Sequence, residues 1–417
     1  MPERSAPLPN HRKVIRFPES GRERRRILRQ SEDPRLRLAS VLASASGWLF
    51  ALALVLFLIT NYRLFTPDSL RSLFTSLAAG MQTTTSDAAT IEYASGSIID
   101  AELFGGGLAY VDSDTLYVSK PNGVNQLSFQ LSYGNPAVET SNSLVLAYDR
   151  GGKEAVLANA LTDVCAITLD SPILSGTIGE NGGFALVTDE SGFKTAVRVY
   201  NDHGGEPVFT WQTSKYYIQA AALSPDGNYL ALLAFRQDGV ELCSELLFWR
   251  LKRRQDEQEA DAVYSLGSAL GYAVKFLNSS TAAVMTDHGA CLVTRKGVLL
   301  GTDEVPPGDL IGYAFCDRGI LVASNAYQGA ARCEIRLLSA NGSISEEPLY
   351  ISSEIQHLSA DGSVFGALTT DGLQVYSVSS WNELWTNHTV TGARGLRMDS
   401  SGTAYVLYGS DCRIFRH

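Results

Sequence analysis

The chain has 417 residues, of which 45% are apolar and 19% are charged, and its formal net charge is −10. This apolar content excludes a chain that is disordered throughout, and six cysteines in this length exclude a small disulfide-stabilised scaffold. Single hydrophobic cores stop growing at roughly 250–300 residues, so the length requires several domains or a repeat, ring or barrel architecture.

The charge is distributed unevenly. Residues 1–37 carry 11 Arg and Lys against 5 Asp and Glu, whereas the remainder is strongly acidic. An acidic protein with a basic head is not expected to bind nucleic acid in general. We expect residues 1–37 to form a disordered cytoplasmic tail whose arginines lie near anionic lipid head groups. Docking of a cytoplasmic partner on this tail is the alternative.

Residues 38–62 contain no charged side chain, and their centre is almost continuously apolar. About 20 apolar residues cross a hydrocarbon core of ~30 Å, so this stretch predicts one transmembrane helix. A buried core helix would not need an apolar surface on all sides over this length. Seven arginines closely precede the stretch: Arg22, Arg24, Arg25, Arg26, Arg29, Arg35 and Arg37. The positive-inside rule therefore predicts a cytoplasmic N-terminus and an extracytoplasmic C-terminal part.

Two export signals are alternatives to an uncleaved anchor. A cleaved signal peptide would have a shorter apolar region and a small-residue cleavage site, and Asn61-Tyr-Arg-Leu-Phe offers no such site. Arg24 to Arg29 resembles a twin-arginine signal, but Glu32, Asp33 and Pro34 separate it from the apolar stretch. We therefore expect a signal anchor in the cytoplasmic membrane.

Residues 63–89 are expected to connect the anchor to the rest of the chain. Thr66, Pro67 and Asp68 are typical of a helix start, and apolar residues follow at helical spacing from Leu70 to Leu77. This short amphipathic helix would lie on the membrane surface or pack on the following domain. A polar linker begins at Gln82.

From about residue 90 onwards the chain repeats one unit, in which a turn residue precedes a short apolar strand. The spacing from one such strand to the next is 36 to 52 residues. The eight strands begin at Leu108, Leu144, Phe184, Tyr229, Thr281, Ile320, Val364 and Thr403. Four strands per 40–45 residues is the pattern of a β-propeller blade. We therefore predict an all-β, eight-bladed propeller over residues 90–417.

Ring closure supports the number eight. The last unit supplies an inner strand from Ala393, a second from Thr403 and a third from Cys412, and then the chain ends. Thr90 to Ala94, just before the first unit, is predicted to provide the missing outer strand. A seven-bladed ring, with the short first unit as the misassigned one, is the alternative.

Several blade motifs resemble known propeller families. Ala222-Leu-Ser-Pro-Asp-Gly-Asn-Tyr-Leu-Ala231 is similar to the WD40-like repeat of bacterial propellers. The segments that end at Trp211 and Trp385 are similar to blade ends of PQQ-like (quinoprotein-like) propellers. Together with the basic tail and the single span, the chain resembles a membrane-anchored bacterial propeller family, clostridial in character and of uncharacterised activity. The resemblance implies a fold and no particular function.

Enzyme and metal motifs are missing from the sequence. It contains no HExxH, CxxC, GxSxG or P-loop pattern, and its six histidines show no metal-ligand spacing. His203 and His288 are expected in exposed turns. Asp112-Ser-Asp114 could hold Ca²⁺ weakly, but it fits a hairpin turn better because an oxygen cage needs more ligands. We assign no catalytic, cofactor-binding or metal-binding residue.

Quinone chemistry would need Ca²⁺ held by carboxylates and amides together with an aspartate base, and no such set can be assigned. Trp211 and Trp385 are expected to be packing anchors between blades. Lys252 to Asp261 is predicted to form a charged loop between the third and fourth strands of its unit, either a solvated turn or a docking loop.

The cysteines follow the repeat. Cys243, Cys291, Cys333 and Cys412 all fall near the start of a third strand, whereas Cys165 and Cys316 lie elsewhere. Equivalent positions in different blades are too far apart for the Cα separation of ~5.5 Å in a disulfide. We therefore expect free thiols and the same gel mobility with and without reductant.

The sequence thus predicts a single-pass membrane protein that displays a propeller outside the cytoplasmic membrane. We expect a non-catalytic interaction platform or ligand sensor, without a cofactor, that binds an envelope protein, a small ligand or a glycan. An envelope enzyme, quinoprotein-like or glycan-acting with residues scattered over the blades, is the alternative. Signalling from the propeller to the basic tail is a third hypothesis.

Overall fold

Eight four-stranded antiparallel sheets make up the fold of the described residues, and every regular element among them is a β-strand. The structure is a computed structural model that describes residues 89–252, 259–326 and 332–416, which all belong to one unit, Asp68–His417. The expected tail, transmembrane helix and most of the connector lie outside the described residues. Within the part described, no helix could span a membrane.

The first four blades follow one another along the chain, each with its strands in sequence order from the centre outwards. Blade 1 comprises β2 (Asp100–Phe104), β3 (Gly107–Val111), β4 (Thr115–Ser119) and β5 (Asn125–Gln130). Blade 2 comprises β6 (Pro136–Thr140), β7 (Val145–Asp149), β8 (Glu154–Ala158) and β9 (Asp163–Thr168). Blade 3 comprises β10 (Ile173–Ile178), β11 (Phe184–Thr188), β12 (Thr195–Asn201) and β13 (Gly204–Thr213). Blade 4 comprises β14 (Tyr217–Leu223), β15 (Tyr229–Asp238), β16 (Glu241–Arg250) and β17 (Ala262–Gly267).

The remaining blades continue the ring, and the last of them takes its outer strand from the start of the described chain. Blade 5 comprises β18 (Gly271–Asn278), β19 (Thr281–Thr286), β20 (Gly289–Thr294) and β21 (Leu299–Glu304). Blade 6 comprises β22 (Leu310–Cys316), β23 (Gly319–Asn325), β24 (Cys333–Ser339) and β25 (Leu349–Ile351). Blade 7 comprises β26 (Ile355–Asp361), β27 (Val364–Thr369), β28 (Gly372–Ser377) and β29 (Glu383–Asn387). Blade 8 comprises β30 (Gly395–Met398), β31 (Ala404–Leu407), β32 (Asp411–Phe415) and β1 (Ala89–Glu92).

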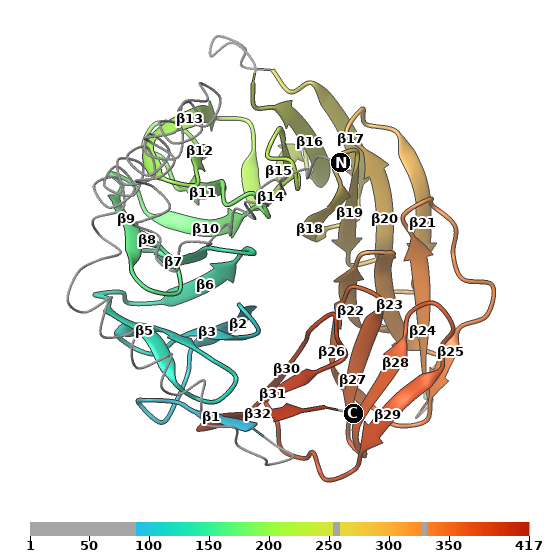
Figure 1. The fold of residues 1–417 in the computed structure, drawn as a ribbon. Helices are drawn as coiled ribbons and strands as arrows, with labels where there is room; N and C mark the ends of the chain where they lie inside the picture. The colour runs from blue at the N-terminus through green and yellow to red at the C-terminus, as the bar shows by residue number, and fades with distance from the viewer. Residues whose placement is uncertain (1–88, 253–258, 327–331, 417) are drawn as a thin grey trace, which may run out of the picture. The chain divides into compact units, whose positions relative to one another are not determined.

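The first strand of each blade lies nearest the centre of the ring (Figure 1). We call the end of the ring at which these inner strands begin the upper end, and the opposite one the lower end. Because the sheets are antiparallel, the turns between second and third strands also lie at the upper end. The turns between first and second strands, and between third and fourth strands, lie at the lower end.

The second strand of each blade explains why the repeat is visible in the sequence. Strands β3, β11, β19 and β27 are buried along their whole length. A sheet packed on both faces by neighbouring blades buries both sides of such a strand, so the sequence is continuously apolar rather than alternating. Inner and outer strands keep one partly exposed side, as β17 does with its alternating pattern.

The turn at Ser224 to Gly227 illustrates how each hairpin is fixed. Ser224 Oγ donates to Asp226 Oδ1 over 2.6 Å, and the Gly227 amide donates to the Ser224 carbonyl over 2.8 Å. Gly227 has φ +65°, a conformation that costs glycine nothing. The serine, aspartate and glycine of this motif are therefore turn residues, as the WD40-like resemblance implies.

Ring closure follows the prediction. Strand β1 pairs antiparallel with β32, with Thr90 opposite Arg413 and Ile91 opposite Cys412. Ile91 is fully buried in a core shared by blades 8 and 1. The eight-bladed assignment is confirmed, and the seven-bladed alternative is wrong because the short first unit forms a complete blade.

One hairpin is longer than the sequence indicated. The sequence places the start of the second strand of unit four at Tyr229 and that of its third strand near Cys243. Instead β15 and β16 continue pairing up to Asp238 opposite Glu241. Arg236 stabilises this extension, because its guanidinium contacts Glu245 Oε1 and Asp238 Oδ2, each over 2.6 Å.

Candidate functional site

The inner strands of all eight blades line a central cavity of about 830 Å³. Its lining includes small residues, the aromatic rings of Tyr272, Tyr313 and Phe315, and several charged side chains. The charged side chains are Glu102, Glu139, Arg150, Glu180, Lys275, Asp361 and Arg397. A cavity of this size and polarity can accommodate a small polar ligand.

The charges concentrate where blade 8 meets blades 1 and 2. Arg397 Nη2 on β30 lies 2.6 Å from Glu102 Oε1 on β2. Burial raises the pKa of Glu102, and the charge of Arg397 partly offsets this effect. Burial, together with the charges of Glu102 and Asp100, raises the pKa of Glu139 on β6 to about 8. Glu139 therefore carries a proton at neutral pH and can donate a hydrogen bond into the cavity.

The same region does not assemble a nucleophile and a base. His357 lies on β26, and burial and the nearby Arg397 lower its pKa, so its imidazole is neutral at pH 7. None of the histidines in the described ranges hydrogen-bonds to a serine, threonine or cysteine side chain. These residues offer hydrogen bonds and charge rather than an acyl-transfer arrangement.

The upper end of blades 3 to 5 exposes an unusual number of large apolar side chains. We call this set the upper patch: Leu174, Phe193, Tyr217, Val240, Leu242, Leu270 and Tyr272. They belong to the starts of inner strands and to the turns between second and third strands, so they share one end of three neighbouring blades. Val240, at the tip of the long β15–β16 hairpin, is fully exposed. Exposed apolar clusters of this kind typically mark interaction sites.

A polar network holds this hairpin above blade 4. Tyr216 Oη donates to Glu245 Oε2 over 2.6 Å, and Glu245 also accepts from Arg236. Burial raises the pKa of Tyr216 and its bond to Glu245 raises it further, so the phenol stays protonated. The hairpin is therefore a fixed projection, because side chains from β15, β16 and the preceding loop brace it.

A groove of about 560 Å³ lies below the upper patch, between the outer strands of blades 3 and 4. Trp211 on β13, Leu247 on β16 and Val263 on β17 provide apolar surface to it. Lys215 lies toward its upper end, where β13 leads into β14, and Glu259 toward its lower end, before β17. Val263 is 49% exposed although its cross-strand neighbour Leu247 is buried.

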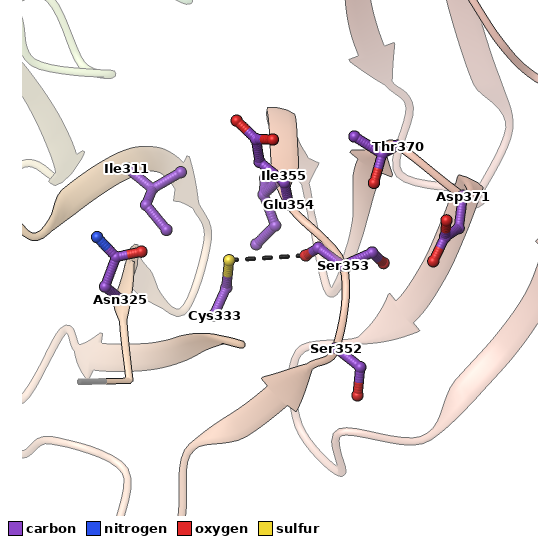
Figure 2. A pocket seen from close by; sticks show the side chains of 9 residues that line it. All are labelled: Ile311, Asn325, Cys333, Ser352, Ser353, Glu354, Ile355, Thr370 and Asp371. Carbon is purple, nitrogen blue, oxygen red and sulfur yellow. Dashed lines mark hydrogen bonds between the residues drawn. The ribbon is translucent and has the colours of Figure 1, made fainter. Parts of the chain in front are cut away.

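A second pocket, of about 650 Å³, lies between blades 6 and 7 at the upper end (Figure 2). The Cys333 thiol points to the backbone of Ser353 and donates to its carbonyl over 3.6 Å. Glu354 and Asp371 bring two carboxylates to the lining, but no histidine lines the pocket to activate the thiol.

The predicted turn residues lie where the sequence placed them. Asp112 Oδ1 accepts from the amides of Asp114, over 3.0 Å, and Thr115, over 2.8 Å, which is a hairpin turn rather than a calcium loop. The described residues contain no group of three or more His, Cys, Asp or Glu placed to hold a metal ion. His203 and His288 are exposed, each beside the aspartate that precedes it.

The tryptophans and cysteines also follow their predictions. Trp211 packs against Trp249 of the next blade with ring centroids 5.0 Å apart. Trp385 Nε1 on blade 7 donates to the Gly402 carbonyl of blade 8 over 3.3 Å. None of the six cysteines forms a disulfide. Burial raises the pKa of Cys291 and of Cys412 to about 12, so both are inert apolar residues.

Sequence reasoning missed the main surfaces. Glu102, Glu139 and Arg397 belong to different units and read as ordinary strand residues. The upper patch has a faint signal, because Val240 and Leu242 interrupt a polar turn. The charged loop that we predicted from Lys252 to Asp261 lies largely outside the described residues.

Comparison with known proteins identifies the fold. A family model described as "Family of unknown function (DUF5711)" matches residues 81–385. BamB from Moraxella catarrhalis matches 80% of this chain and 97% of its own length, with 10% identity and a TM-score of 0.50. Sqt1 from Saccharomyces cerevisiae matches 79% and 98%, with 11% identity and a TM-score of 0.55. No curated protein sequence matches the chain. The likeness to PQQ-like and WD40 propellers is thus confirmed as a likeness of fold alone.

Proposed function

We propose that this chain, which belongs to the DUF5711 family of unknown function, is a non-catalytic interaction platform. It binds a partner protein through the upper patch. The observation that carries this proposal is the concentration of exposed apolar side chains on neighbouring blades, with the projecting β15–β16 hairpin among them. Rigid scaffolds commonly place binding residues on such loops.

The path of the chain favours the upper patch over the opposite end. Strand β1 is an outer strand, and its register with β32 means that Ala89 lies at the lower end and Glu92 at the upper end. The chain therefore enters the propeller at the lower end. The first described residue of the propeller thus lies at the end opposite the upper patch.

We also propose that the propeller is displayed outside the cytoplasmic membrane. The apolar residues 38–62 and the arginines before them support a single span with a cytoplasmic N-terminus. In this arrangement the partner is a component of the cell envelope, and the basic residues 1–37 face the cytoplasm.

Site-specific photo-crosslinking in intact cells tests the platform. A photoreactive phenylalanine analogue replaces Tyr217 of the upper patch, and the matched control replaces Tyr350 on the outer strand of blade 6. The two tyrosines are 55% and 44% exposed. We expect a stoichiometric envelope protein crosslinked from Tyr217 and not from Tyr350.

Equal labelling from both positions would contradict a defined platform. Absence of any protein from both would favour a small ligand or the enzyme hypothesis instead. The purified chain would then be screened for glycan binding and turnover.

A further inference from the structure

We propose that the central cavity binds a neutral saccharide. The sugar ring stacks on an aromatic wall from blades 5 and 6, and its hydroxyl groups bond to a polar wall from blades 8, 1 and 2. This inference goes beyond the proposed platform function and does not rest on it, because it would hold equally for a chain that binds no protein at the upper patch.

The first argument is the aromatic wall, which consists of Tyr272 on β18 and of Tyr313 and Phe315 on β22. The ring centroids of Tyr272 and Tyr313 lie 5.7 Å apart with the planes at 65°, and those of Tyr313 and Phe315 lie 5.4 Å apart at 76°. These edge-to-face contacts fix the three rings as one unit, and Tyr272 is still 38% exposed. The C–H groups on one face of a sugar ring carry partial positive charge and pack on the negative face of an aromatic ring.

The second argument is the position of the polar wall, which faces the aromatic wall across the cavity. In a ring of eight blades each blade faces the one four places further on, so blade 1 faces blade 5 and blade 2 faces blade 6 (Figure 1). Glu102 and Glu139 come from the inner strands of blades 1 and 2. Glu102 and Tyr313 both occupy the middle of their strands. A ligand that bridges the cavity therefore meets both walls.

The third argument is the mixture of donors and acceptors on the polar wall. Arg397 donates from Nη2 to Glu102 Oε1 over 2.6 Å and from Nη1 to the Leu396 carbonyl over 3.2 Å. A guanidinium group has five N–H donors and a carboxylate has two acceptor oxygens, so both groups have capacity beyond these bonds. Glu139 is protonated at neutral pH and adds an uncharged donor. Sugar hydroxyl groups donate and accept, so they match this mixture.

The fourth argument is the balance of charge in the lining. With Glu139 protonated, the remaining ionisable side chains named above for the cavity are three acidic and three basic groups: Glu102, Glu180 and Asp361, and Arg150, Lys275 and Arg397. A balanced lining offers no net attraction to an anion or a cation. The volume of about 830 Å³ lies within the range of small-molecule sites, roughly 300–1,000 Å³. Size and charge together therefore favour an uncharged polar ligand.

A glycan array probed with the full-length chain tests the inference. The chain is purified in a detergent without a sugar head group, so that the detergent does not compete. The probes are immobilised neutral hexose and N-acetylhexosamine oligosaccharides, and matched oligosaccharides that end in a uronic acid. We expect retention on a neutral glycan and binding at least about tenfold weaker to its uronic acid counterpart, whose carboxylate would meet the acidic groups of the polar wall. Retention on no neutral glycan, or a preference for the uronic acid, would overturn the inference.

Variants of both walls show whether the glycan lies in the cavity. Tyr272→Ala removes the exposed ring and Glu139→Leu removes the uncharged donor, and each should weaken binding of the retained glycan by about tenfold in isothermal titration calorimetry. Tyr272→Phe and Glu139→Gln keep a ring and a donor and should bind within about threefold of the parent chain.

Tyr350→Ala is the matched control, because Tyr350 is 44% exposed on the outer strand of blade 6 and lies outside the cavity lining. It should leave the affinity within about twofold. Urea denaturation identifies the variants that fold. Unchanged affinity in a folded Tyr272→Ala or Glu139→Leu chain would contradict the assignment of the glycan to the cavity.

Competition distinguishes two sources of the sugar. Displacement of the immobilised glycan by the free monosaccharide identifies a free sugar as the ligand, whereas displacement by the oligosaccharide alone identifies the end of a chain, and both results support a saccharide site. The two proposals can fail separately. If no glycan is retained while Tyr217 still crosslinks a protein, the saccharide site is wrong and the platform holds. If the glycan binds in the cavity but nothing crosslinks from Tyr217, the upper patch is the wrong surface.

Discussion

Two junctions between blades solve the same packing problem with different chemistry. Where blade 8 meets blade 1, short strands join the two ends of the described chain, and the Glu102–Arg397 pair bridges the inner strands. Where blade 3 meets blade 4, long strands pack through Trp211, Trp249 and Tyr216. The first junction has charge in the cavity and little exposed apolar surface. The second also exposes apolar side chains of the upper patch, which is why we assign protein binding to it.

The largest expected effect comes from breaking the ring-closing junction. Ile91→Asp places a carboxylate at a fully buried position of β1. We expect a loss of about 4 kcal/mol or more in the free energy of unfolding, because both the apolar contacts and the solvation of the charge are lost. Urea denaturation followed by tryptophan fluorescence measures it. Thr90→Asp, at the exposed neighbouring position, should change stability by less than about 0.5 kcal/mol.

The second effect tests the aromatic junction. Trp211→Ala removes a side chain that is 6% exposed and packs on Trp249 of the next blade. We expect a loss of about 3–4 kcal/mol in the free energy of unfolding. Val208→Ala on the same strand, where the side chain is 38% exposed, is the control and should cost far less. If the two substitutions lowered the free energy of unfolding equally, the aromatic contacts would not stabilise this junction.

The contrast between the junctions also shows how far sequence reasoning extends. The buried second strands, such as β19 over Thr281–Thr286, are continuously apolar, so they reveal the repeat and the number of blades. The missing outer strand of blade 8 revealed the closure at Thr90. Both signals can be read from a short stretch of sequence. The first comes from burial of a strand on two faces, and the second comes from counting the strands of the last unit.

The functional surfaces have no such local signal. Glu102 and Arg397 lie almost 300 positions apart, and only the closed ring brings them together. The β15–β16 extension depends on Arg236, which reads as a polar loop residue until its contacts with Glu245 and Asp238 are seen. Charge pairs and exposed patches are properties of the assembled ring, so the sequence predicts the scaffold better than the sites.

A smaller effect is expected for the ion pair at ring closure. Arg397→Met leaves Glu102 without its partner, and both side chains of the pair are 32% exposed. We expect a loss of about 1–2 kcal/mol, below the cost of breaking a fully buried pair, because water in the cavity screens the charges. Glu102→Gln in the Arg397→Met chain should recover part of this loss. Arg413→Met, whose side chain is 50% exposed, is the control and should cost less than about 0.5 kcal/mol.

The smallest effect depends on pH and concerns Glu139 in the same cluster. Its pKa is about 8 in the folded chain, above the ordinary value of 4.5. Between these two values the folded state holds a proton that the unfolded state has lost, so this group lowers stability as pH rises from about 5 to 8. Above pH 8 both states are ionised, and the penalty stays constant.

Glu139→Gln removes that titration. We expect the variant and the parent chain to match at pH 5, and the variant to be more stable by about 1 kcal/mol at pH 8.5, after allowance for partial exposure. Urea denaturation at several pH values measures the difference. A difference at Glu139 that is the same at every pH would mean that its carboxyl group is ionised throughout this pH range in the folded chain as well.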